Sequence, residues 1–254
     1  MFTKIFIIKC LTDNYAYIIH NEDKDHNILV DAPEEEKIIN FLEKKEWKLN
    51  SILLTHHHHD HIAGVEELRK KYNCKVYGSK KDQKRLPRLD FQLGEEEFEI
   101  NNIKIKSLEV DGHTIGHLAF YFEKENILFS GDSLMSFGCG RLFEGTAYQM
   151  FESLEKLKKL PPKTFVYSGH EYSLNNANFA VTLEKSNEKI KLRKEKIISQ
   201  IKKNLPTIPV TLEEEVDTNP FLRSHIQEIK NKLKMKSHEN RDIFKKIREL
   251  KDQF

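Results

Sequence analysis

At 254 residues, the chain is long enough for one large domain or for a medium domain with a smaller companion. Its net charge is only +2 although 32% of its residues are charged, so the overall balance indicates neither a nucleic-acid partner nor a membrane surface. No apolar stretch approaches the roughly 20 residues that span a bilayer, and the three widely spaced cysteines form no C-x-x-C pair, which predicts reduced thiols.

The first apolar run, residues 5–8, lies between Lys4 and Lys9. It is too short for a signal peptide and is not followed by a small-residue cleavage site, so we expect it to form the first strand. The predicted location is therefore the cytoplasm.

Short apolar runs rich in β-branched and aromatic residues recur up to residue 170 and predict strands. They cover residues 4–10, 14–20, 26–32, 50–56, 74–79, 98–110, 117–122, 126–132 and 164–170. Segments with helical periodicity lie between some of them, at residues 34–47, 61–73 and 147–160. Interleaved strands and helices predict a layered α/β domain with buried sheets.

From residue 171 the strand signals nearly vanish. Residues 183–204 predict a long charged helix that ends before Pro206 and Pro209, and residues 221–233 and 240–254 predict later helices. We therefore predict a catalytic domain at residues 1–170 and a helical, substrate-binding domain at 171–254. Lysines crowd this second part, which makes an anionic ligand a reasonable expectation.

Polar residues that can bind metals follow several of the predicted strands. They occur in "LLTHHHHDH", "FSGDS" and "VYSGHEY", and "DGHTIGH" opens a strand between them. In open α/β sheets, reactive groups gather beyond the carboxyl ends of the strands. We therefore expect separate strands to deliver these side chains to one crevice.

The spacing within "THHHHDH" predicts which histidines can bind the same ion. Where a strand runs into a loop, residues two apart point the same way, so His56 and His58 can bind one ion. His57 and His59 then point elsewhere, as outer-shell or packing residues.

Asp60 and His61 begin the next helix and face a second position. With His113, Asp132 and His170, seven ligands are available, too many for one tetrahedral ion and suited to two that share a carboxylate. Imidazole and carboxylate donors fit two divalent ions per chain, zinc first, with iron or manganese as alternatives.

Other histidines have simpler explanations. An internal histidine run after a strand is not a purification tag, and His117 is expected to pack or to lie in the outer shell. Isolated histidines are usually surface or satisfied core residues, and we expect this of His20, His26, His225 and His238.

The sequence resembles the metallo-β-lactamase fold superfamily and, within it, the glyoxalase II (hydroxyacylglutathione hydrolase) family. The resemblance covers almost the whole chain and is most specific in "GCGRLFEGTA" and in the tail ending "KDQF". The other motifs that carry it are "LTDNYAYII", "THHHHDHIAG", "DGHTIGH", "FSGDSLM", "YSGHEYSLNNANFA" and "NPFLR". It implies an α/β fold of four layers, an αββα sandwich, followed by a helical domain.

The resemblance also implies a division of the metal ligands. Asp60 and Asp132 are the implied catalytic carboxylates, and Asp132 bridges the two ions. The implied ligands are His56, His58 and His113 for one metal and Asp60, His61 and His170 for the other.

Five residues are implied to bind the substrate. Arg141, Tyr172, Arg248 and Lys251 match positions that bind glutathione in the family, and Phe143 stands where a tyrosine is common. Arg248 and Lys251 are three residues apart, so on a helix they can meet one carboxylate together. The missing hydroxyl at Phe143 predicts that one substrate contact is lost or replaced.

The implied reaction is hydrolysis of the thioester S-D-lactoylglutathione to glutathione and D-lactate, the second step of methylglyoxal detoxification. Water activated between two cations is the nucleophile. With this nucleophile, no serine or cysteine nucleophile is required, and none is evident. The chain has no G-x-S-x-G elbow, and no P-loop pattern occurs either.

Three alternatives stay open at this stage. A persulfide dioxygenase would use one iron on the same scaffold, although the tail "IRELKDQF" speaks against it. A nuclease would carry an additional domain or exosite arm, and a binding module would keep a metal without catalysis. The expected partner is a small glutathione thioester, with no nucleic acid and no membrane, and the expected state is a monomer or weak oligomer.

Overall fold

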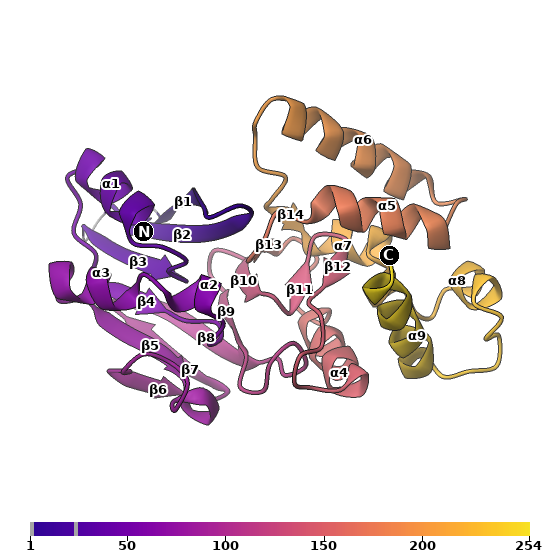
Figure 1. Cartoon of the computed structure of the whole chain (residues 1–254), viewed down its shortest axis with the longest axis horizontal. Coiled ribbons are helices and arrows are strands. Elements are labelled where there is room, and N and C mark those ends of the chain that lie inside the picture. Colours follow the sequence, from indigo (N-terminus) through magenta and orange to yellow (C-terminus); the bar gives the residue numbers. More distant parts are fainter. Residues whose placement is uncertain (1–2, 23–24) are drawn as a thin grey trace. The chain divides into compact units, whose positions relative to one another are not determined.

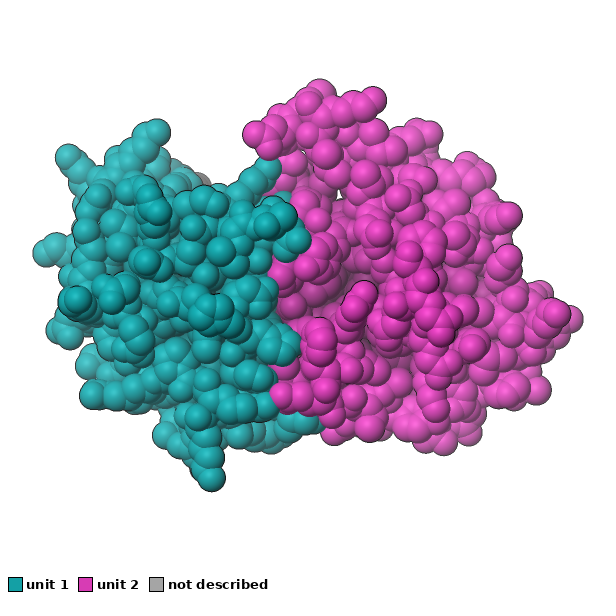
Figure 2. All heavy atoms as spheres, in the orientation of Figure 1, with its two compact units in different colours: residues 1–109, 115–131 teal, residues 110–114, 132–254 magenta. Residues whose placement is uncertain are grey.

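The structure is a computed structural model, and it describes residues 3–22 and 25–254 (Figure 1). The chain forms two compact units (Figure 2): Met1–Glu109 with Ile115–Gly131, and Val110–Thr114 with Asp132–Phe254. This division does not test the predicted boundary at residue 170, which stays a prediction. Across the described residues, no helix is both long and apolar enough to cross a membrane.

The first unit holds two groups of hydrogen-bonded strands. One sheet has the order β1-β2-β3-β4-β5-β6, with β1 to β3 antiparallel and β3 to β6 parallel, and the other group runs β10-β9-β8-β7. The strands are β1 (Thr3–Cys10), β2 (Asn14–Asn21), β3 (His26–Val30), β4 (Ser51–Leu53), β5 (Lys75–Ser79), β6 (Phe91–Leu93), β7 (Glu96–Ile100), β8 (Ile103–Glu109), β9 (Leu118–Phe122) and β10 (Ile127–Gly131). Because β3 and β4 are parallel, the residues that follow them meet at one sheet edge.

Helices cover one face of the first sheet. The helical segments of this unit are α1 (Glu36–Lys44), α2 (His59–Ile62), α3 (Val65–Tyr72) and the 3₁₀ turn η1 (Lys80–Asp82). Ile38 and Leu42 of α1 and Leu68 of α3 join a buried apolar cluster that includes Ile18 and Leu29 of the sheet. Burial of these apolar faces, rather than helix propensity, holds such short helices in place.

The opposite face of this sheet packs on the second group of strands. The rings of Tyr17 in β2 and Phe129 in β10 have centroids 5.2 Å apart, and those of Tyr77 in β5 and Phe98 in β7 are 5.9 Å apart. Aromatic pairs at these separations contribute beyond the area they bury. The first unit therefore has a core on each side of the β1–β6 sheet.

Two predicted elements of this unit are divided in the structure. The predicted strand 98–110 is the hairpin β7–β8, whose turn residues Asn101 and Asn102 have φ values of 50° and 67°. The predicted helix 61–73 is interrupted between α2 and α3. Gly64 lies at the interruption, where a Cβ would come 2.7 Å from the backbone carbon of Glu34, so only glycine permits this approach.

The second unit is mostly helical. Its elements are β11 (Leu134–Met135), β12 (Gly138–Cys139), α4 (Ala147–Leu157), β13 (Phe165–Ser168), α5 (Ser173–Leu183), α6 (Glu188–Lys202), β14 (Val210–Thr211), α7 (Leu212–Thr218), η2 (Pro220–Leu222), α8 (Gln227–Lys232) and α9 (Asn240–Asp252). The charged segment predicted as one helix begins instead at α6, where the Asn187 side chain accepts hydrogen bonds from the backbone of Lys189 and Ile190. The predicted final helix is confirmed as α9.

Aromatic and aliphatic side chains hold these helices together. Ala177 and Ala180 of α5 pack with Ile190 and Ile197 of α6 around the ring of Phe137. The rings of Phe151 in α4 and Phe244 in α9 lie 5.7 Å apart. This packing holds α9, which carries the predicted substrate-binding residues Arg248 and Lys251.

The prediction of unpaired cysteines is confirmed. Cys10, Cys74 and Cys139 are free and buried. Burial raises the pKa of the Cys10 thiol to about 12 and the pKa values of Cys74 and Cys139 to about 11. None of them offers a thiolate near neutral pH, as a cysteine nucleophile must.

Candidate functional site

The first group of predicted metal donors lies directly after β4. His56 Nδ1 is 3.0 Å from Thr55 Oγ1, and His56 Nε2 is 3.0 Å from His58 Nδ1. His56 is fully buried and His58 only partly. Two imidazole nitrogens this close to each other can bind the same cation, as the alternation of side chains along the loop predicts.

Asp60 and His61 lie on the short helix α2 and form a second pair of donors. His61 Nε2 is 3.8 Å from Asp60 Oδ2. His61 is buried, whereas the Asp60 side chain is 40% exposed. A carboxylate and an imidazole at this separation can together bind one divalent ion beside the helix.

Asp31, at the end of β3, supports both pairs and was not predicted. It is buried, and its carboxylate accepts from the Thr55 backbone N–H and from Thr55 Oγ1, both at 2.8 Å, and lies 2.8 Å from His61 Nδ1. A carboxylate on the second nitrogen of a ligating histidine fixes the ring and raises its basicity. The aspartate that ends the strand "ILVD" is the sequence signal that could have identified it.

Asn14 is a second supporting residue that the sequence analysis missed. Its Nδ2 donates to Asp60 Oδ2 at 2.9 Å and to the Asp60 carbonyl at 3.0 Å. The amide therefore orients the Asp60 carboxylate. Asn14 belongs to "LTDNYAYII", one of the motifs that carry the family resemblance, but the motif alone gives it no role.

The three histidines expected to be outer-shell or packing residues have surroundings of other kinds. His57 Nδ1 lies 2.7 Å from Asp82 Oδ2, and His59 is exposed. The buried ring of His117 stacks on that of His56, with centroids 4.7 Å apart. These contacts agree with that expectation, although the ligand assignment itself stays a prediction.

The remaining predicted donors lie together within the second unit. Asp132 Oδ2 is 3.4 Å from His113 Nε2 and 3.3 Å from His170 Nε2. All three residues are buried. His113 Nδ1 lies 2.7 Å from the Arg141 carbonyl, which directs its Nε2 toward Asp132. A carboxylate oxygen between two imidazole nitrogens is the arrangement expected of a bridging ligand.

Two predicted substrate residues lie next to these histidines. The ring of Tyr172 stacks on His170 with centroids 4.8 Å apart, and the ring of Phe143 meets His113 edge-on at 5.3 Å. Phe143 is 64% exposed and Tyr172 39% exposed. Both rings can therefore contact a ligand beside the donor group of this unit.

The cationic residues of the same unit differ in their surroundings. Arg248 is buried, donates to the Cys139 carbonyl at 2.8 Å and binds Asp252 Oδ1 at 2.8 and 3.1 Å. Lys251 donates to Asn175 Oδ1. The prediction that Arg248 and Lys251 share a helix is confirmed by α9, while a direct bond from Arg248 to the substrate stays a prediction.

The ammonium of Lys251 has a lower pKa than that of an ordinary lysine. Partial burial, and next the charges of Arg248 and Arg141, lower the pKa of its ammonium to about 8. Arg141 is largely exposed, with its Nε 3.9 Å from Asp252 Oδ1. This cluster has an excess of positive charge and is suited to an anionic group of a ligand.

Residues 12–170 match the metallo-β-lactamase superfamily, to which the chain therefore belongs. Residues 171–254 match the family described as hydroxyacylglutathione hydrolase C-terminus. Hydroxyacylglutathione hydrolases of Cereibacter sphaeroides and Pelagibacter ubique are 44% and 42% identical to the chain, cover 99% of it, and are themselves covered over 99% and 100% of their length. Within the superfamily, the chain is a member of the hydroxyacylglutathione hydrolase, or glyoxalase II, family.

Solved structures share the fold at lower identity. The BLEG-1 B3 metallo-β-lactamase aligns with a TM-score of 0.68 and 24% identity over 86% of this chain and 99% of its own. ETHE1 from Myxococcus xanthus aligns with a TM-score of 0.69 and 22% identity over 98% of this chain and 90% of its own. These matches confirm the predicted metallo-β-lactamase-like α/β fold, and the match at residues 171–254 confirms the C-terminal helical domain.

Proposed function

We propose that the chain hydrolyses S-(2-hydroxyacyl)glutathione thioesters, S-D-lactoylglutathione first among them, to glutathione and a 2-hydroxy acid. With that substrate the acid is D-lactate, and the reaction is the second step of methylglyoxal detoxification. The family membership makes the chain a hydrolase. Relatives named hydroxyacylglutathione hydrolase match it over nearly the whole length, including the helical part that distinguishes this family within the superfamily.

We further propose that the two groups of donors form one dinuclear centre. His56, His58 and His113 would bind one ion, and Asp60, His61 and His170 the other, with Asp132 between them. The observation that carries this proposal is the Asp132 carboxylate, whose Oδ2 lies 3.4 and 3.3 Å from two imidazole nitrogens. Support for two ions also comes from TTHA1623, a similar structure with 25% identity and a TM-score of 0.65, which is described as di-iron-bound.

The donor set suits zinc first, with iron or manganese as alternatives, because imidazole and carboxylate ligands accept all three. Two divalent cations, once bound, would activate a water molecule for attack on the thioester carbonyl and stabilise the negative charge that develops on its oxygen. Asp60 and Asp132, the proposed catalytic carboxylates, would hold the ions at this position. The departing thiol has a pKa of roughly 8.5, so it leaves without a strong general acid.

The substrate would be anchored by the second unit. Lys251 and Arg141 offer positive charge to the carboxylates of glutathione. Tyr172 and Phe143 would contact the part of the substrate nearest the reacting carbonyl, because their rings lie against His170 and His113. Arg248 would act partly by holding Asp252 and the Cys139 carbonyl.

A steady-state assay with S-D-lactoylglutathione, run with metal analysis of the same sample, tests the proposal. We expect hydrolysis by the native chain and its loss in Asp132→Ala and His58→Ala while the fold survives. His59→Ala is the matched control, since this exposed histidine lies in the same run and should leave both metal content and turnover unchanged. Full turnover in Asp132→Ala would refute the assignment of the site.

The same preparation separates the remaining alternatives. Oxygen consumption coupled to turnover of a glutathione persulfide would favour the one-iron dioxygenase over the hydrolase, whereas salt-sensitive cleavage of nucleic acid would indicate a nuclease. We keep a cytoplasmic location and a monomeric or weakly oligomeric state as predictions. Cell fractionation and light scattering would check them.

A further inference from the structure

A short hairpin joins Asp132 to Arg141 within the second unit. Its strands β11 and β12 pair with each other, and just beyond them the Gly140 N–H donates to the Asp132 carbonyl at 2.8 Å. The Arg141 carbonyl in turn lies 2.7 Å from His113 Nδ1. The position of the hairpin therefore sets the backbone of one predicted metal ligand and the ring orientation of another.

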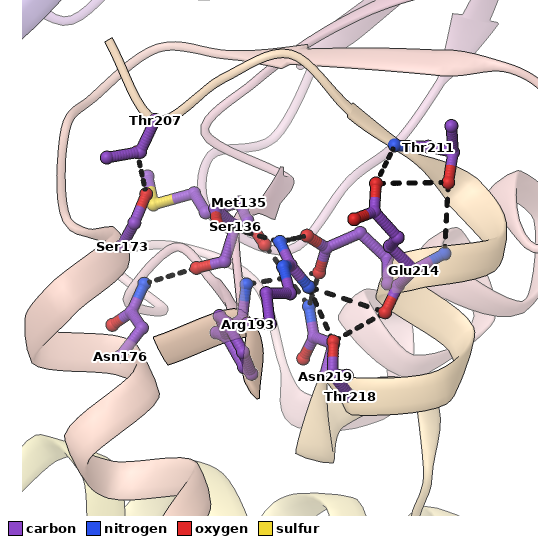
Figure 3. A network of polar contacts seen from close by, with 12 residues as sticks. Met135, Ser136, Ser173, Asn176, Arg193, Thr207, Thr211, Glu214, Thr218 and Asn219 are labelled. Atoms are coloured by element: carbon purple, nitrogen blue, oxygen red, sulfur yellow. Dashed lines mark hydrogen bonds and ion pairs between the residues drawn. The ribbon is translucent and has the colours of Figure 1, made fainter. Parts of the chain in front are cut away.

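Side chains from α6 and α7 hold the turn of this hairpin (Figure 3). Arg193 of α6 donates to Ser136 Oγ at 2.9 Å and places its guanidinium 4.0 Å from the centroid of the Phe137 ring. Glu215 of α7 accepts from the Phe137 backbone N–H at 3.1 Å. Phe137 has a φ of 58°, a conformation that a bulky residue adopts only when its surroundings enforce it.

Two asparagines add contacts to the backbone of the same hairpin. Asn219 Nδ2 lies 3.1 Å from the Met135 carbonyl and 3.0 Å from the Gly138 carbonyl, so it links the two strands. Asn176 Nδ2 donates to the Ser136 carbonyl at 3.0 Å. Side chains of α5, α6 and α7, with Asn219 directly after α7, thus bind a hairpin of only two residues per strand.

Arg193 and Glu215 form an ion pair with each other, and both are buried. Arg193 also donates to Thr218 Oγ1. Well-packed apolar residues often stabilise a core as well as a buried ion pair does, because desolvation of the charges offsets their attraction. Arg193 and Glu215 each also bond to the turn of the hairpin, so the pair is better explained by the geometry it specifies there.

We propose that the Arg193–Glu215 pair, with Asn176 and Asn219, positions the β11–β12 hairpin and thereby orients Asp132 and His113 for metal binding. These are positioning residues, since the hairpin backbone lies between them and the donor atoms. The inference rests on the proposed metal centre. Part of the metal affinity would then depend on residues of α5 to α7 and on Asn219, which follows α7.

Glu215→Gln tests the proposal because it keeps the side-chain volume and removes the charge. We expect zinc affinity, measured by titrating the metal-free full-length protein against a chromophoric chelator, to fall by about 10- to 100-fold, the usual effect of losing a support of metal ligands. In the zinc-loaded protein, kcat should fall more than KM rises. The matched control is Glu184→Gln, which weakens the ion pair that Arg223 forms with Glu184 in the same unit through donated bonds of 2.7 and 2.8 Å, neither of which involves the hairpin.

The control should lower the melting temperature comparably and leave zinc affinity unchanged. Equal losses of affinity in both variants, or none in Glu215→Gln, would overturn the positioning role. If Glu215→Gln does not fold, Ser136→Ala removes the hydrogen bond that Arg193 donates to the turn and leaves the Phe137 ring contact in place, and it must weaken zinc binding for the proposal to stand. Failure of the native chain to bind zinc, iron or manganese would instead refute the metal centre itself, so the two failures are distinguishable.

Discussion

His61 Nδ1 lies 2.8 Å from Asp31 Oδ2, and both side chains are buried at the end of the parallel strands β3 and β4. The same carboxylate accepts two hydrogen bonds from Thr55, the residue before the first predicted metal ligand. One aspartate thus connects the loop of His56 with the helix of His61. Its role as a support of two donor pairs leads to the first prediction.

Asp31→Asn should weaken metal binding by about 10- to 100-fold, because the amide cannot supply the charge that orients His61. Chelator competition on the metal-free protein measures this. The matched control is Asp82→Asn, which alters an equally buried carboxylate 2.7 Å from His57, a histidine that is not a predicted ligand. If the two substitutions weaken metal binding equally, Asp31 has no special role.

The sequence offers a signal for the proposed metal donors but only a weak one for the residues that support them. Strand ends and side-chain alternation are local features, so they mark His56, His58 and Asp60 as candidates without any knowledge of the tertiary structure. Asp31 and Asn14 acquire their roles only through strand pairing and loop approach, and each has the local sequence of an ordinary turn residue.

Dependence on contacts outside the local pattern also explains two errors in the predicted strands and helices. Periodicity marked residues 98–110 as extended but could not show that Asn101 and Asn102 turn the chain into a hairpin. It also could not show that Gly64 interrupts a helix, because the close contact there is with Glu34, far away in sequence. The Arg193–Glu215 pair was also missed, because Arg193 lies in the charged helix predicted at residues 183–204 and Glu215 lies outside it, so that only tertiary packing brings the two side chains together.

Lys251 predicts a pH dependence of substrate binding. Its pKa, lowered to about 8 by burial and by Arg248 and Arg141, means that the ammonium is charged well below pH 8 and loses its proton as pH rises through that value. If the charge binds a substrate carboxylate, KM should rise above pH 8, and by up to about tenfold at pH 9, where about a tenth of the side chain stays charged. The profile of kcat/KM reports this pKa in the free enzyme.

Two variants show whether that profile belongs to Lys251. Lys251→Arg keeps its charge throughout and should move the decline of kcat/KM to higher pH. Lys251→Gln should have a high KM at every pH and no inflection near pH 8. An inflection that persists unchanged in Lys251→Gln assigns the titration to another group.

Substitution of Arg248 should lower the stability of the protein more than substitution of Lys251 does. Arg248→Ala removes bonds to the Cys139 carbonyl and to Asp252, so we expect unfolding to become easier by about 1.5–3 kcal/mol, the usual contribution of hydrogen bonds to charged groups. Lys251→Ala should cost no more than about 1 kcal/mol. Both should raise KM more than they lower kcat if, as proposed, the two side chains bind a remote part of the substrate.

Chemical denaturation and steady-state kinetics on the same two variants check this difference. A stable Arg248→Ala protein with a raised KM would mean that the arginine acts on the substrate alone. A destabilised protein with normal kinetics would mean that it has only a structural role. The prediction requires a raised KM in both variants and a clearly larger loss of stability in Arg248→Ala than in Lys251→Ala.

Gly140 provides a steric test of the donor group in the second unit. A Cβ at this position would lie 2.3 Å from the Asp132 carbonyl oxygen and 2.7 Å from His113 Nδ1, so Gly140→Ala must displace one or both predicted ligands. Metal content should therefore fall sharply, and turnover with it. Gly94→Ala is the matched control, because its Cβ would meet only Glu109 Oε1 at 3.9 Å, and it should keep its metal. If Gly140→Ala binds metal normally, Asp132 and His113 cannot both be ligands in the arrangement described.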